Sequence, residues 1–241
     1  MPPPLEYLAA IAVGDTSSSR RDSLYGLLRR EQSLAASRQP SVRSEVSRIL
    51  DFAQAAYGDL VGMLVGRDDR LLDSERDGDW SLRDVIRHAV AVELRYAAQV
   101  NYSATRGESD PMEIPQSLLP CDRLAPPEPE FARSQTGGIN EILELLGRAR
   151  ESSDARLADI AEASLGRPSA WGSRLIDVRT RLQQIAVHLT ETGIQVEKIV
   201  GASSELRAIV RRCCTMRGMH ERWSPATARA ILDESYRASV A

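Results

Sequence analysis

Two stretches of the chain decide its fold: WSLRDVIRH at residues 80–88 and RLQQIAVHLTETGIQVEK at residues 181–198. In the first, Ser81 is a natural N-cap residue, and Asp84 three positions later completes a capping-box pattern. A helix is therefore predicted to begin here, and its apolar periodicity continues to about residue 104. In the second, apolar residues recur every three or four positions without an interrupting proline. Both stretches are predicted to be amphipathic helices with one buried face.

The same periodicity predicts two more long helices, over residues 41–72 and 138–164, and places the last of the four at residues 175–200. Several prolines between residues 105 and 136 forbid a continuous helix there, which predicts a long connection. The buried stripe of the first helix is predicted to comprise Ile49, Phe52, Ala53, Ala56, Leu60, Met63 and Leu64. No stretch is predicted to form a strand. Four long amphipathic helices joined by loops predict an all-α four-helix bundle.

Two segments flank the bundle, which is predicted to span residues 43–200. Residues 1–42 are predicted to be an N-terminal extension, with short helices at Leu5–Val13 and around Leu24–Leu28. Residues 201–241 are predicted to be a C-terminal helical tail packed on the bundle. The buried face of this tail is predicted to comprise Leu206, Ile209 and Val210.

The C-terminal tail carries two further signals. Ser224 followed by Pro225 predicts the start of a last helix, because proline is favoured at the first helical position. Cys213 and Cys214 lie among arginines, and two interpretations stay open for them. Their thiols could have lowered pKa values, or they could be small residues in a partly buried helix.

Composition excludes several classes of function. The chain has 241 residues, 31 Lys and Arg against 34 Asp and Glu, and a formal net charge of −3, so nothing global attracts nucleic acid or an anionic membrane. We find no signal peptide and no apolar run long enough to span a bilayer. The three cysteines are too few for a disulfide framework and are expected to be reduced. These features predict a cytoplasmic protein.

The chain has three histidines, so each can be weighed singly. The periodicity places His88 and His188 near the inward edges of two different helices. Two such imidazoles can converge on one divalent metal, and imidazole suits zinc, nickel, iron or copper. On spacing alone, the favoured interpretation is that each is a histidine satisfied within the core or at its boundary. His220 in the tail would add a ligand only if the tail folds back, and otherwise it is an exposed residue.

The two quoted stretches resemble the second-helix and last-helix signatures of the DinB/YfiT-like family. Glu93 and Tyr96 follow the first stretch as the family pattern requires, and the order of helices and the long connection also match. The resemblance covers residues 43–200. It implies a DinB/YfiT-like four-helix bundle and a metalloenzyme ancestry shared with thiol-dependent S-transferases and mycothiol-dependent maleylpyruvate isomerase.

In that family, one histidine of the second helix and two of the last bind a divalent metal. The resemblance places His88 and His188 on two ligand positions and Thr192 on the third, where the family has histidine. A neutral hydroxyl is a poor ligand, and a catalytic zinc normally takes three protein ligands. Glu191 points about 100° away around the helix, and Glu93 would need a favourable tilt to reach the site. Weak or no binding of zinc or nickel is therefore expected.

Two functions remain after this weighing. The missing third histidine favours a non-catalytic or small-molecule-binding bundle with a degenerate, two-histidine metal site. The alternative is a divalent-metal-dependent enzyme of the thiol S-transferase or isomerase type that uses His88 and His188. The expected partners are a small molecule or low-molecular-weight thiol and a second copy of the chain in a homodimer, without nucleic acid or membrane.

Overall fold

The computed structural model of the protein describes residues 18–38, 43–74 and 79–223, together with Ala10, Ala230, Asp233, Glu234 and Arg237. The helices expected at Leu5–Val13 and after Ser224 and Pro225 lie outside these described ranges. Within the described part, no helix has both the length and the hydropathy needed to cross a membrane.

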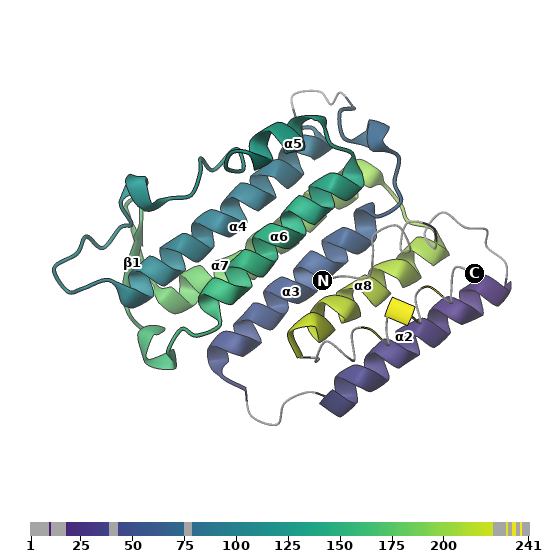
Figure 1. Ribbon diagram of the computed structural model, residues 1–241, viewed down its shortest axis with the longest axis horizontal. Helices are drawn as coiled ribbons and strands as arrows, with labels where there is room; N and C mark the ends of the chain where they lie inside the picture. The colour runs from purple at the N-terminus through teal and green to yellow at the C-terminus, as the bar shows by residue number, and fades with distance from the viewer. Residues whose placement is uncertain are drawn as a thin grey trace.

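Four long helices form the bundle: α3 (Glu45–Leu64), α4 (Leu82–Thr105), α6 (Ile139–Leu157) and α7 (Val178–Val200). Helix α7 packs against both α3 and α4, while α6 packs against α4 and, less extensively, against α3 (Figure 1). The predicted all-α four-helix bundle is confirmed. The centre of the core is aliphatic. It includes Leu50, Leu60, Ile86, Leu146 and Leu182, each of which is 0 % exposed.

Two further helices extend the bundle on one side, α2 (Ser18–Arg38) and α8 (Glu205–Trp223). Helix α8 packs against α3, and α2 packs against α8 (Figure 1). The predicted burial of Leu206, Ile209 and Val210 is confirmed. Helices α3 and α8 approach closely at Gly62, where a Cβ atom would lie 2.5 Å from the Cα of Arg211.

The prediction of no strands is wrong. Residues Pro168–Trp171 (β1) and Arg174–Asp177 (β2) pair in an antiparallel hairpin, which turns at Gly172 with a φ of 54°. This hairpin occupies the sequence between α6, which ends earlier than predicted, and α7. A short 3-10 helix, η3 (Glu162–Ser164), lies just before it. Asp177 then caps α7 by accepting the N–H of Thr180.

Two other predictions need correction. Phe52 is not part of the buried stripe of α3, because it is 70 % exposed. The connection after α4 is not entirely irregular. It contains a short 3-10 helix, η2 (Gln116–Leu118), and the seven-residue helix α5 (Glu130–Thr136).

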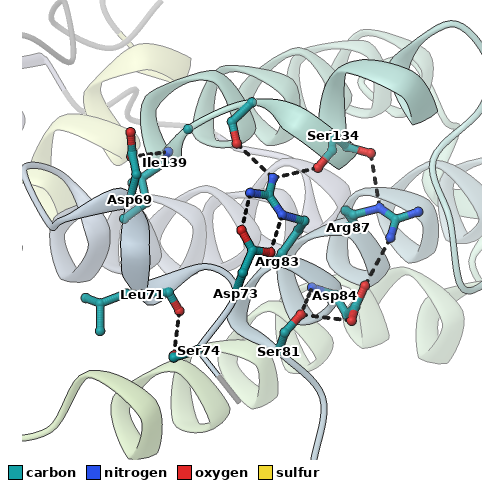
Figure 2. Close-up of polar contacts among 12 residues, drawn as sticks. Asp69, Leu71, Asp73, Ser74, Ser81, Arg83, Asp84, Arg87, Ser134 and Ile139 are labelled. Atoms are coloured by element: carbon teal, nitrogen blue, oxygen red, sulfur yellow. Dashed lines mark hydrogen bonds and ion pairs between the residues drawn. The ribbon is translucent and has the colours of Figure 1, made fainter. Parts of the chain in front are cut away.

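Helix α4 holds the end of this long connection through two buried arginines (Figure 2). Arg83 donates to the carbonyls of Ser134 and Gly137 and pairs with Asp73, which follows the 3-10 helix η1 (Asp69–Leu71). Arg87 donates to the hydroxyl of Ser134, which is a residue of α5. Buried guanidinium groups that donate several hydrogen bonds give these contacts a defined geometry. The connection is thereby fixed along α4, beside the position of His88.

Candidate functional site

The structure brings the histidines of α4 and α7 together. Helix α4 begins at Leu82 because the Ser81 hydroxyl accepts the backbone N–H of Asp84 at 3.1 Å. His88 follows one turn later, and His188 lies across from it on α7. Their Nε2 atoms are 3.3 Å apart, and their rings meet edge to face.

The other ring nitrogen of His88 has its own partner. Nδ1 lies 2.5 Å from the carbonyl oxygen of Arg123 in the long connection. A carbonyl can only accept, so Nδ1 carries the proton, and the Nε2 lone pair of a neutral His88 accepts a hydrogen bond from the Nε2–H of His188. Arg95 supports the same stretch by donating to the carbonyl of Cys121. The connection therefore sets the tautomer of His88 and directs its Nε2 towards His188.

Aromatic rings border the two histidines. The Trp80 ring lies 4.9 Å from the ring of His88, and the Tyr96 ring lies 5.9 Å from that of His188, measured between centroids. Trp80 is 45 % exposed, so this end of the seam between α4 and α7 reaches the surface. We call this group, Trp80, His88, Tyr96 and His188, the histidine site.

Burial keeps both imidazoles neutral. It lowers the pKa of His188 to about 4, with the neighbouring His88 as a second cause. It also lowers the pKa of His88, partly offset by the hydrogen bond to the Arg123 carbonyl. Near pH 7 both rings are therefore uncharged, which is the form that accepts a hydrogen bond or a metal ion.

A buried arginine continues the site along the same seam. Arg181 of α7 is 0 % exposed, and its guanidinium lies over the Tyr96 ring at 4.7 Å and over the Trp171 ring at 4.8 Å. Trp171 itself is 42 % exposed. Arg181 was not identified from the sequence as a candidate site residue. Its spacing of seven residues from His188, two turns on one helix face, was the signal that could have found it.

Comparison with known proteins bears directly on the chain's ancestry. A model of the DinB superfamily matches residues 50–191, more than half of the chain. The chain belongs to the DinB superfamily. The DinB/YfiT-like resemblance of the sequence is thus confirmed.

A solved structure of the DinB type is also similar to this chain. It is YfiT from Bacillus subtilis, described as a probable metal-dependent hydrolase with an unusual four-helix bundle topology. The match has 17 % identity and a TM-score of 0.49, and it covers 66 % of this chain and 90 % of YfiT. Comparison with curated proteins gave no match.

Thr192, which the resemblance aligns with the third ligand position of the DinB superfamily, lies one turn beyond His188. It is buried, and its hydroxyl donates to the backbone carbonyl of His188 at 2.9 Å. This is the usual i to i−4 hydrogen bond of a threonine within a helix. The hydroxyl proton is therefore used inside α7.

The other acidic side chains considered for this DinB site are engaged elsewhere or exposed. Glu93 is buried and pairs with Arg150 of α6, which takes it away from the histidines. Glu191 is exposed on α7. The side chain of His220 lies outside the described residues. Among the side chains that are described, no group of three His, Cys, Asp or Glu residues could hold a metal ion.

The two thiols of the tail lie in the protein interior. Cys213 and Cys214 are buried and free of disulfide bonds. Burial raises the pKa of Cys213 to about 12, and the charge of Glu31 adds to the effect. The interpretation of a lowered thiol pKa is therefore wrong for Cys213, because burial and the charge of Glu31 both raise it.

An open groove lies on another face of the bundle. It has a volume of about 770 Å³ and runs between α3 and α7. Three large apolar side chains along it, Phe52, Val187 and Ile194, are between 51 % and 70 % exposed. We call it the α3–α7 groove. It does not include the histidine site.

Proposed function

We propose that the protein is a small-molecule-binding member of the DinB superfamily, with its ligand site at the histidine site. The observation that carries this proposal is the meeting of two neutral imidazoles, bordered by Trp80 and Tyr96, in a seam that reaches the surface. Aromatic walls with a few convergent polar groups are the usual lining of a small-molecule site. The histidine nitrogens would orient the ligand by hydrogen bonds, and the rings would contact its apolar part.

The donor set fits a resident metal poorly. His88 and His188 offer two nitrogen ligands, and the hydroxyl at Thr192 is a neutral oxygen whose proton is donated within α7. Catalytic zinc sites normally have three protein ligands drawn from His, Cys, Asp and Glu. We therefore assign no step of chemistry to a metal in this protein.

One observation favours a second candidate, a divalent-metal-dependent enzyme of the thiol S-transferase or isomerase type. Two nitrogens bound to one tetrahedral zinc at about 2.0–2.1 Å are roughly 3.3 Å apart. The two Nε2 atoms have this separation, 3.3 Å. The Arg123 carbonyl also orients His88 as ligand-supporting groups do. His88 and His188 would hold the metal, and a bound zinc or nickel would stabilise the thiolate of a low-molecular-weight thiol.

Metal content separates the two candidates. The protein would be purified without chelator, analysed for metals, and titrated with zinc and with nickel. We expect substoichiometric metal and weak binding in the wild type, and tight binding gained by Thr192→His, which restores three histidines. His88→Ala is the matched control. Near-stoichiometric metal in the wild type that is lost in His88→Ala would refute the lead proposal and support the enzyme.

We also propose a homodimer formed through the α3–α7 groove. Large contiguous apolar side chains on a surface usually mark an interface. The groove supports this proposal because Phe52, Val187 and Ile194 come from two adjacent helices and are all exposed.

A further inference from the structure

The guanidinium of Arg181 is buried and poorly paired. Tyr96 is the polar neighbour that acts on its charge, but none of its three nitrogens, Nε, Nη1 and Nη2, makes a hydrogen bond of normal geometry to a described residue. Arg181 also forms no ion pair within the described part of the chain. By contrast, the equally buried Arg150 of α6 pairs with Glu93 and Asp154. Buried polar groups without partners are rare in proteins, and such a group is commonly satisfied by a bound water, ion or ligand.

The rings around Arg181 decide which atoms a ligand could reach. The guanidinium lies over the rings of Tyr96 and Trp171, which attract the cation through the plane of the group. Such contacts leave the N–H groups at the edge of the plane unsatisfied. A carboxylate accepts two parallel N–H bonds from that edge and is planar itself. The missing partner is therefore best matched by a carboxylate.

The same helix face joins Arg181 to the histidine site. Gln184 and His188 follow Arg181 by three and seven residues, and residues at these spacings share one face. The Gln184 side-chain oxygen is a second buried atom without a partner among the described residues. Tyr96 contacts both ends, since its ring lies near both Arg181 and His188. Two helical turns separate these ends by about 10 Å, which a small molecule can span.

We propose that Arg181 binds the carboxylate of the small-molecule ligand, while the rest of the ligand extends towards the histidine site. This inference rests on the proposed function and names the ligand class. Because Arg181 is fully buried under Trp171, entry of the ligand requires the hairpin of β1 and β2 to move. Trp171 is the last residue of β1 and is followed by Gly172, where the hairpin turns, so we place this movement at that turn.

Calorimetric titration of the full chain with benzoate and with benzamide tests the proposal. These probes have the same ring, but only benzoate carries a carboxylate. We expect benzoate to bind at least tenfold more tightly than benzamide. Arg181→Met should weaken benzoate binding at least tenfold, and Arg181→Lys, which keeps the charge without the planar fork, should weaken it less. The matched control is Arg179→Met, two residues away and paired with Glu45, which should bind benzoate as the wild type does.

Thermal unfolding of each variant shows whether it is folded. If Arg181→Met does not fold, benzoate binding by Arg181→Lys still tests the proposal. Equal affinity for the two probes, or unchanged benzoate binding in both Arg181 variants, would overturn the proposal. Neutral fragments, screened by the NMR signals of His88 and His188, test the proposed small-molecule function separately from the carboxylate assignment. Neutral fragments that bind there while carboxylates do not would refute the carboxylate assignment and leave the proposed function standing. Absence of binding by either class would refute both.

Discussion

Replacement of Arg181 by methionine should make the ligand-free protein more stable. Methionine keeps the apolar stem in place and removes a buried charge that makes no hydrogen bond of normal geometry to a described residue. Burying an ion costs several kcal/mol, and replacing buried charges by apolar residues is often neutral or stabilising by about 1–4 kcal/mol. That range is already net of the attractions lost with the charge, and the attraction of the guanidinium to two rings places this protein in its lower half. The net expectation is a gain of about 1–2 kcal/mol in the free energy of unfolding.

Scanning calorimetry in the absence of carboxylate buffers measures this gain. For a chain of this length, 1 kcal/mol corresponds to roughly 2–4 °C in Tm, so Arg181→Met should melt about 3–6 °C higher. The control Arg179→Met removes an arginine of the same helix that is 39 % exposed and paired with Glu45. It should change stability by no more than about 1 kcal/mol.

The reasoning would be refuted if Arg181→Met lost more than about 2 kcal/mol. Such a loss would mean that the guanidinium is well satisfied in the free protein, as expected for a structural arginine. Benzoate provides a second reading of the same experiment. It should raise the Tm of the wild type and leave that of Arg181→Met unchanged, because only a ligand that binds the folded state stabilises it.

Three further predictions concern other parts of the molecule. The folded-state pKa of His188, about 4, lies below its ordinary value of 6.5, so the free energy of unfolding should fall by roughly 3 kcal/mol as the pH drops from about 6.5 to 4. In His188→Gln, the free energy of unfolding measured with denaturant should depend less on pH over this window. Gly62→Ala should destabilise by about 1–3 kcal/mol because its Cβ would meet α8 at Arg211, whereas Gly26→Ala, with nothing within 4 Å, should not; equal melting of the two variants would contradict this packing. Phe52→Glu should convert the proposed homodimer to a monomer in sedimentation experiments, and a wild type that is already monomeric would exclude the dimer.

Local signals in the sequence were sufficient for the helices and for part of the site. Ser81 predicts the start of α4 because capping depends on neighbouring residues alone. Resemblance and periodicity together selected His88 and His188, and the structure brings their side chains together. The roles of these histidines and of Thr192 as metal ligands, and the division of the chain into an extension, a bundle and a tail, stay predictions.

The missed features depend on contacts between distant segments. The strands of the hairpin at Pro168–Asp177 have four residues each, too short to show a period of two. Phe52 has the right spacing for the buried stripe of α3, yet its surroundings leave it exposed. Arg181 reads as a surface residue, and its burial arises from Tyr96 and Trp171 of other elements. Helical periodicity does not show which side chains of distant segments bury a given residue.

The central claim is tested most directly by NMR spectra that correlate the ring nitrogens of histidine with carbon-bound ring protons over two or three bonds. The protein would be labelled with ¹⁵N at histidine, and spectra would be recorded at pH 7 without zinc and with one equivalent of zinc. These spectra report the tautomer of each ring and the binding of metal to a ring nitrogen. We predict that His88 is neutral with its proton on Nδ1, where it donates to Arg123, that His188 is neutral, and that zinc leaves the Nε2 signals of both unchanged. Stoichiometric zinc shifts at both Nε2 atoms would contradict the claim and identify the site as a metal centre.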